Sequence, residues 1–434
     1  MAPLKIAIIG AGPAGSTLAL ILHNAGIEAT IFESEPNANA RNQGGTLDLH
    51  DNTGLLAIKR AGLWDTFTKK CRYDGEAMIA SNKYLRRYLN LPGATEGSSR
   101  GRPEIDRTVL RQMLVDALPA PTVRWNHHLK NIDDSDPTNI TLHFRDGTTY
   151  SGFDLLVGAE GAWSKVRSLV THVKPFYAGM SMIRYTISDV KNRYPDLHEL
   201  VNRGSLFAFS DGKAILAQQL GDGSLSTSAV RLTPEEFLKN LPYDSADGKA
   251  GKEHSLSYFQ DWDPRLRKLI EVTDDTEPWY GNICSLPVGT RWAHRPGITL
   301  IGDAAHALVP WAGEGVNLSL EDSVKLADAI ITASKTASEK GTVSKEVLSA
   351  RVKEYEEDMF VRAKKTSGMS YNMMNAMFYE TGAPDLTMEK YVTVAMGDPV
   401  PWWAVPVLSV VVSTYFRWFR WWYPGLGDIH KKTR

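Results

Sequence analysis

The sequence predicts an α/β fold that joins a Rossmann-like unit to a β-rich insertion, a long C-terminal helix and an apolar C-terminal tail. Lys5–Ile9 and Glu28–Phe32 are short apolar runs typical of buried parallel strands, and Ser16–Ala25, which lies between them, has helical spacing. Residues 176–285 alternate between apolar and polar side chains in several stretches, which favours strands with one solvated face. Helical spacing returns after Gly315.

The composition of the 434-residue chain excludes some classes of function. The 49 basic and 50 acidic side chains nearly cancel, whereas a nucleic-acid-binding protein needs a basic excess or stripe to neutralise phosphates. The two cysteines, Cys71 and Cys284, are far apart in sequence, so we expect no disulfide framework and a reducing or cytosol-facing environment. Neither cysteine has a partner at metal-binding spacing, and no metal site is predicted.

A glycine-rich turn separates the first predicted strand from its helix. Gly10, Gly12, Ala14 and Gly15 belong to a pattern that lets the backbone turn tightly, approach a pyrophosphate and pack the helix on the strand. Backbone N–H groups at the helix start then bind the phosphates. Glu33 ends the next strand, where its carboxylate can accept a hydrogen bond from an adenosine ribose. This motif alone leaves FAD and NAD both open.

A second motif, near residue 310, decides between the two cofactors. Asp303 follows a buried strand, where it can accept hydrogen bonds from the ribityl chain that joins phosphate to flavin ring. Gly313 and Gly315 allow close approach of the backbone to a flat ring, and the helix that begins near Gly315 directs its positive end there. Such a dipole stabilises the negative charge of a reduced flavin. We therefore predict FAD, with Pro310 and Asn317 in the same binding segment.

Three segments carry a resemblance to a known family: Gly10–Gly15, Asp154–Arg167 and Gly302–Asn317. Together they resemble the group A FAD-dependent monooxygenases, the aromatic hydroxylase family. Within that family, Gln43–His50 and Pro103–Arg111 look most like the tetracycline-degrading monooxygenases. The resemblance extends over most of the chain and is weaker in the predicted β-rich region. Its motifs are specific for the cofactor and say little about the substrate.

The resemblance implies roles for further residues. Arg107 would lie on the pyrophosphate side of FAD, and Asp48 matches an aspartate that contacts the flavin. Arg41 matches an arginine linked to the nicotinamide nucleotide, and Arg184 is expected to point from a strand into the substrate cavity. The segment Asp154–Arg167 serves both FAD and NAD(P)H in this family.

Some positions depart from the family pattern. Glu160 stands where many relatives have aspartate, which weakens the assignment of its segment to nicotinamide binding. Ser226 and Ser205 align roughly with a histidine and an arginine that tetracycline-degrading relatives use for substrate. Because serine offers neither ring contacts nor charge, we do not expect tetracycline as the physiological substrate. His306 is expected to be structural, and no catalytic side chain is assigned.

The resemblance implies an FAD-dependent monooxygenase that hydroxylates or epoxidises a lipophilic small molecule of aromatic, polyketide-like or isoprenoid type. NAD(P)H, with NADPH as the expected transient co-substrate, would reduce FAD, and O₂ would then form a flavin hydroperoxide in a dry pocket. Two alternatives stay open. One is a flavin-dependent reductase or dehydrogenase of the same fold that inserts no oxygen. The other is a non-catalytic, flavin-binding protein tethered to a membrane.

These expectations divide the chain into five parts. The FAD-binding domain is predicted in two pieces that flank a β-rich substrate domain, and a helical segment and a hydrophobic tail follow. The predicted bounds are 1–175 and 286–345 for the FAD-binding domain, 176–285 for the substrate domain, 346–391 for the helical segment and 392–434 for the tail.

The predicted tail combines an apolar run with aromatic and basic residues. Val400–Phe416 is nearly free of charge and close to the short limit for a membrane-spanning helix, although Pro401 and Pro406 interrupt it. Five of the 12 tryptophans lie between Trp402 and Trp422, as is typical of a membrane–water interface. We expect a membrane-associated protein that faces the cytoplasm, or a cytoplasmic one. The alternative is an extension that packs over the catalytic domain or a dimer partner.

Overall fold

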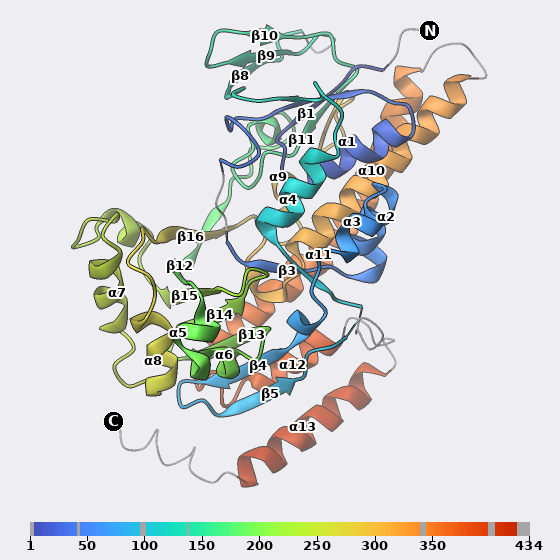
Figure 1. Cartoon of the computed structure of the whole chain (residues 1–434). Helices are drawn as coiled ribbons and strands as arrows, with labels where there is room; N and C mark the ends of the chain where they lie inside the picture. The colour runs from blue at the N-terminus through green and yellow to red at the C-terminus, as the bar shows by residue number, and fades with distance from the viewer. Residues whose placement is uncertain are drawn as a thin grey trace.

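The computed structural model describes residues 4–40, 44–95, 101–136, 139–338, 344–397 and 404–422 (Figure 1). A five-stranded parallel sheet lies beside helix α1 (Pro13–Asn24), which packs on its central strands. The order of its strands is β17 (Ile298–Leu300), β11 (Leu155–Gly158), β1 (Ile6–Ile9), β2 (Ala29–Phe32) and β7 (Val123–Arg124). Every side chain of β1 and β11 is buried, which explains why these segments are continuous apolar runs. The predicted opening unit of strand, helix and strand is confirmed.

A seven-stranded sheet forms the second layer of the molecule, below the first in Figure 1. Its order is β16 (Trp279–Ser285), β12 (Phe176–Ile187), β15 (Leu225–Leu232), β14 (Lys213–Gln219), β13 (Ser205–Ser210), β4 (Met78–Asn82) and β5 (Arg87–Leu91). Five strands come from the region predicted to be β-rich. The other two, β4 and β5, come from the part of the chain predicted as FAD-binding domain, and β4 pairs with β13 in parallel. The domain bounds stay predictions, but this sheet contains strands from both sides of the predicted bound at residue 176.

The two faces of this sheet contact different parts of the protein. Because side chains alternate along a strand, Ile215 and Ala229 point to one face and Ala214 and Val230 to the other. The first face packs on α5 (Val190–Arg193), α6 (Pro195–Val201) and α8 (Pro264–Glu271). The second face contacts the end of α11 (Lys345–Met374), α12 (Met388–Gly397) and the segment around Trp311. The second face therefore lies toward the predicted flavin motif.

The remaining elements are short, apart from α10 (Gly315–Ser338), which runs alongside both α1 and α11. A two-stranded sheet joins β3 (Thr46–Asp48) to β6 (Glu104–Asp106), and a three-stranded one contains β8 (Leu129–Asp133), β9 (Thr141–Phe144) and β10 (Thr149–Tyr150). The other helices are α2 (Leu56–Arg60), α3 (Trp64–Thr68), α4 (Arg107–Asp116), α7 (Gly248–Leu256) and α9 (Asp303–His306). Single helical turns are η1 (Asp51–Leu55), η2 (Asp74–Glu76), η4 (Val166–Leu169), η5 (Glu235–Lys239), η6 (Pro310–Ala312) and η7 (Asn375–Tyr379).

The long C-terminal helix α11 confirms the prediction of such a helix, and a buried carboxylate anchors it. Glu356 accepts hydrogen bonds from Trp292 Nε1 (3.3 Å), His294 Nδ1 (2.7 Å) and Thr299 Oγ1 (2.9 Å). Burial raises the pKa of Glu356, while the three hydrogen bonds oppose the rise. The carboxylate therefore joins α11 to the segment before β17 and to β17 itself.

The described part of the tail is a helix, α13 (Val405–Trp422), that packs on α12 through Val412 and Phe416. Val407, Val411 and Trp418 are exposed on another side of it. Among the described residues, we find no helix with the length and apolar character needed to cross a membrane. Val400–Trp403, the start of the predicted apolar run, lies outside the described residues.

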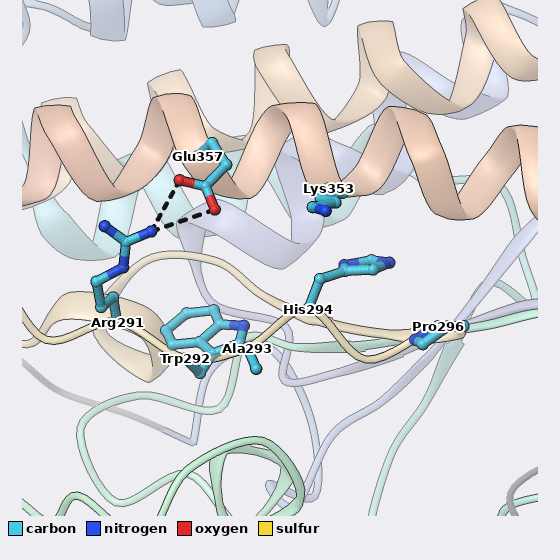
Figure 2. Close-up of a pocket in the computed structure, with 7 residues that line it drawn as sticks. All are labelled: Arg291, Trp292, Ala293, His294, Pro296, Lys353 and Glu357. Carbon is cyan, nitrogen blue, oxygen red and sulfur yellow. Dashed lines mark hydrogen bonds and ion pairs between the residues drawn. The ribbon is translucent and has the colours of Figure 1, made fainter.

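We predict that Glu356→Ala lowers the free energy of unfolding of the FAD-loaded protein by about 3–5 kcal/mol, because three buried donors lose their acceptor. Glu357→Ala is the matched control. The Glu357 side chain is half exposed and forms an ion pair with Arg291 at the surface (Figure 2), so its loss is expected to cost about 1 kcal/mol or less. Urea unfolding of both variants measures the difference. Equal losses would contradict the anchoring role of Glu356.

Candidate active site

The turn between β1 and α1 places three glycines in different environments. Gly10 has a φ of +104°, and a Cβ on Gly15 would lie 2.2 Å from the Gly10 carbonyl oxygen, so the protein itself requires glycine at both positions. A Cβ on Gly12, in contrast, would meet nothing within 4 Å. Gly12 is the N-cap of α1, and no side chain caps the helix. The N–H groups of its first turn are therefore available to phosphates, and the open side of Gly12 lets a ligand approach.

Glu33, at the end of β2, is buried beside this turn. Its Oε2 accepts a hydrogen bond of 2.6 Å from the Ala11 N–H, and its Oε1 accepts bonds of 3.0 Å from Ser34 Oγ and Glu35 N. The carboxylate thus fastens the glycine turn to the second strand. A carboxylate has about four acceptor sites, so these bonds leave room for a ribose hydroxyl. That contact remains a prediction.

Asp303, which follows β17, and Arg107, the first residue of α4, lie near enough for their charges to attract each other. Both side chains are exposed, yet the surrounding protein raises the pKa of Asp303 and lowers that of Arg107. The attraction between the two charges opposes both shifts. The two residues predicted for the middle of the cofactor are therefore brought together.

The segment between α9 and α10 lies against the end of β3. Gly313 has a φ of +72°, which favours glycine, and a Cβ on it would lie 3.7 Å from Asp48 Oδ1. The other oxygen of Asp48, Oδ2, is 3.0 Å from His50 Nε2, and His50 Nδ1 is 3.3 Å from Glu314 Oε1. Burial alone would lower the pKa of His50, but its contacts with Asp48 and Glu314 outweigh this effect and raise the pKa to about 9. A protonated imidazole thus lies between two carboxylates.

Asn317 is fully buried in the first turns of α10 and contacts protein atoms with both ends of its amide. Its Nδ2 donates to the Asp48 carbonyl oxygen (2.9 Å), and its Oδ1 accepts from His50 N (2.9 Å) and Thr53 Oγ1 (3.3 Å). The residue fixes β3 and η1 relative to α10. Direct contact of Asn317 with the cofactor stays a prediction. A Cβ on Gly315, just before it, would meet nothing within 4 Å.

Arg184, on β12, lies where the seven-stranded sheet meets the segment before β3. Its Nη1 donates to the Gly44 carbonyl oxygen (3.0 Å), and its guanidinium lies 4.9 Å from the ring centre of Trp279. Burial, and repulsion from Arg107, lower the pKa of Arg184 to about 10, so the side chain stays charged at neutral pH. Arg184 pairs with Ser228 on the neighbouring strand β15, and Ser228 in turn pairs with Leu216 on β14.

Other predicted residues have contacts within the protein or lie outside the described chain. Arg41 lies outside the described residues, so its predicted link to the nicotinamide nucleotide stays a prediction. Arg167 is buried and donates to the carbonyl oxygens of Ala162 (2.7 Å) and Ala304 (3.0 Å), while Asp154 Oδ2 accepts from Lys5 N (2.9 Å). These two side chains hold the fold together.

Ala14 and Pro310 each lie in one of the two glycine-rich segments. Ala14 is buried in the first turn of α1, and its Cβ lies 3.4 Å from where a Cβ on Gly302 would stand. Pro310 begins η6 with an exposed side chain.

Sequence reasoning missed His50 and Glu314. The alternation of side chains along a strand gives the one available signal, because it places Asp48 and His50 on the same face. Nothing in the local sequence indicates that Glu314 meets them from a segment more than 260 positions away.

A hollow on the surface along α11 lies apart from this site (Figure 2). It is lined by Arg291, Trp292, Ala293, His294, Pro296, Lys353 and Glu357. His294 contacts Glu356 and Ser349 with its two ring nitrogens, so the imidazole already has partners within the protein. In the ranges that the structure describes, no group of three or more His, Cys, Asp or Glu side chains is arranged to hold a metal ion.

The fold and the site define a class of protein that binds a flavin dinucleotide. The open start of α1 suits the pyrophosphate, the neighbouring charges of Asp303 and Arg107 suit the polar linker, and the open side of Gly315 suits a flat ring. Comparison with known proteins agrees. Residues 4–346 match the FAD binding domain family, and the chain belongs to that family.

The similar proteins support the resemblance seen in the sequence. Monooxygenase asqM of Emericella nidulans is 29% identical over 445 residues, which cover 87% of this chain and 96% of that protein. The chloroplastic zeaxanthin epoxidase of Oryza sativa subsp. japonica is 26% identical and covers 84% of this chain, but only 54% of its own length is matched. The crystal structure of tetracycline destructase Tet(51) has a TM-score of 0.64 at 17% identity, covers 94% of this chain and 98% of that chain, and shows the same fold. The predicted relationship to FAD-dependent monooxygenases is confirmed.

We predict that Gly12→Ala leaves the fold intact but weakens FAD binding by about tenfold or more, roughly 1.4 kcal/mol. A Cβ at this position strains nothing in the protein and fills the space through which a pyrophosphate reaches the backbone. Gly368→Ala in α11 is the control, because its Cβ would make only an ordinary contact of 3.7 Å with Val288. Titration of FAD-free protein with FAD, followed by fluorescence, gives both affinities. Wild-type affinity in Gly12→Ala would refute the phosphate site.

Proposed function

We propose that this protein is an FAD-dependent monooxygenase that uses NAD(P)H and O₂ to hydroxylate or epoxidise a lipophilic small molecule. One observation supports the proposal: the two glycine-rich turns lie side by side, with a Cβ on Gly302 only 3.4 Å from Ala14 Cβ, in a chain of the FAD binding domain family. Relatives that align over most of both chains are monooxygenases. The overall reaction converts substrate, O₂, NAD(P)H and a proton into oxygenated substrate, NAD(P)⁺ and water.

Bound FAD would supply the redox chemistry by accepting a hydride from NAD(P)H and activating O₂. The chain's own residues bind and orient it. In the proposal, the α1 start holds the pyrophosphate, Glu33 the ribose and Asp303 the linker beside Arg107. The start of α10 directs its positive end to the ring. NADPH would bind transiently, since the sequence shows a single dinucleotide fingerprint.

The seven-stranded sheet supplies the substrate side of the proposed site. Cross-strand pairing aligns Leu216 and Phe207, both partly buried, with Arg184 on the face toward the flavin motif. Phe209, the next residue on the same face of β13 after Phe207, has its ring centre 6.0 Å from that of Trp311. An apolar wall with one charged group favours an aromatic, polyketide-like or isoprenoid substrate with a polar end, and the wall excludes water from the reaction. Arg184 would orient that polar end.

We expect one oxygen atom from O₂ in the product. The test is to incubate FAD-loaded enzyme with NADPH, ¹⁸O₂ and a panel of lipophilic aromatic, polyketide and isoprenoid compounds, and to analyse the products by mass spectrometry. Incorporation of a single ¹⁸O, with one NADPH consumed per product, supports the proposal. A product changed by two hydrogens without ¹⁸O would replace it with a reductase or dehydrogenase. Oxidation of no compound, with bound FAD that NADPH does not reduce, would indicate a non-catalytic flavin protein.

We also propose that α13 lies on the surface of an anionic membrane. The support is a stripe of exposed apolar side chains on one side of the helix: Val407, Val411, Tyr415 and Trp418. From residue 417 onward, the sequence has five basic residues and a single acidic one, Asp428, which suits negatively charged headgroups. Such an anchor would place the protein at a cytoplasmic membrane face, close to lipophilic substrates.

Vesicle sedimentation tests this membrane proposal. We expect wild-type protein to bind phosphatidylcholine vesicles that contain phosphatidylserine. Val411→Glu should reduce the binding by about tenfold, because a charge replaces apolar area that the membrane would otherwise bury. Val361→Glu is the control, since Val361 lies on α11 and is 71% exposed, against 60% for Val411. Absence of vesicle binding by the wild type, or equal loss in both variants, would reject the proposal.

A further inference from the structure

His50 occupies a position that the proposed function does not use. It follows β3, and its side chain lies between Asp48 on that strand and Glu314 in the segment before α10. Its backbone is fixed as well, because its N–H donates to Asn317 Oδ1 and its carbonyl oxygen accepts from Thr53 N and Leu55 N. The side chain is only 17% exposed. The imidazole thus joins two segments that are far apart in sequence and meet at the ring end of the candidate site.

The charged groups that act on His50 come from two sides. Asp48 on β3 and Glu314 before α10 both favour its protonated form. The other elements packed against it contribute neutral groups: Thr53 from η1 and Asn317 from α10. The two carboxylates outweigh the effect of burial, so His50 carries a positive charge at neutral pH. The charge of His50 therefore offsets part of the negative charge that the two carboxylates bring to this end of the site.

We propose that His50 is a positioning residue for FAD. Its imidazole holds the strand of Asp48 next to the segment of Glu314, as a clamp, and offsets the negative charge of these two carboxylates. This inference rests on the proposed flavin site. The clamp uses Asp48 Oδ2, so the other oxygen, which faces Gly313, remains as the acceptor for a hydrogen-bond donor on the cofactor. Because reduced flavin gains negative charge, the charge of His50 favours reduced FAD more than oxidised FAD.

The experiment compares wild type with His50→Gln by two readouts that need no oxygenation. The first is the dissociation constant of oxidised FAD, and the second is the midpoint potential of the bound flavin by dye equilibration, both from about pH 6 to pH 10. At neutral pH we expect FAD binding to weaken about tenfold in His50→Gln and the midpoint potential to fall. The His50 contribution is present below its folded pKa and is lost as the pH rises through about 9, so the two proteins converge above that pH.

Two further variants keep the test decisive. His23→Gln, an exposed histidine at the end of α1, should match the wild type at every pH. Glu314→Gln keeps the shape of the segment but removes one carboxylate, so the pH at which FAD binding weakens should shift downward. This variant also serves if His50→Gln fails to fold.

A defect of His50→Gln that is the same at all pH values shows a merely structural role and overturns the proposal. Unchanged affinity and potential overturn it too. Lack of oxygenated product in the ¹⁸O experiment, with the pH step intact, contradicts the monooxygenase and leaves the clamp standing.

Discussion

The close packing of α1 on the parallel sheet is the constraint on which the site depends. A side chain on Gly15 would collide with the Gly10 carbonyl, and one on Gly10 would lie 2.6 Å from the Ala159 carbonyl oxygen. With both glycines, α1 lies deep enough for α10 to dock on it, and Ser323 Oγ donates to the Ala14 carbonyl (2.8 Å). The starts of two helices are thereby held at one site. The positive ends of both can then act on a single anionic ligand.

The seven-stranded sheet contacts the segment that leads into β3. Arg184 reaches from the seven-stranded sheet to the Gly44 carbonyl, next to the strand that bears Asp48. Its guanidinium lies 4.9 Å from the ring centre of Trp279, and this contact and the hydrogen bond to Gly44 together orient the side chain. A change in the position of the sheet is therefore transmitted to the β3 segment through one side chain. In the proposed function, this hydrogen bond would join the substrate side of the site to the cofactor side.

Local patterns predicted what depends on local structure. The first strand, its glycine turn, α1 and the second strand follow from apolar runs and helical spacing. The expected role of Asp303 came from its place after a buried strand, and those of Asp48 and Arg107 from the family resemblance. The clamp of His50 could not be predicted, because it requires Glu314, whose position is set by the docking of α10. For the same reason, the sequence could not predict that β4 pairs with β13, which lies more than 120 residues away in the chain. Pairings of this kind leave no trace in the spacing of residues.

The parallel pairing of β4 with β13 also bears on how such a protein can diversify. A unit that is contiguous in the chain can be exchanged by recombination in one step. Here the seven-stranded sheet is interleaved with the unit that bears the glycine-rich turn, since two of its strands are encoded before β7 and five after β11. Exchange of residues 176–285 alone would separate β13 from β4 and expose the edge of the sheet. If the proposed substrate role of this sheet holds, a new substrate range would be reached by replacing side chains on a retained sheet, with the chain order preserved.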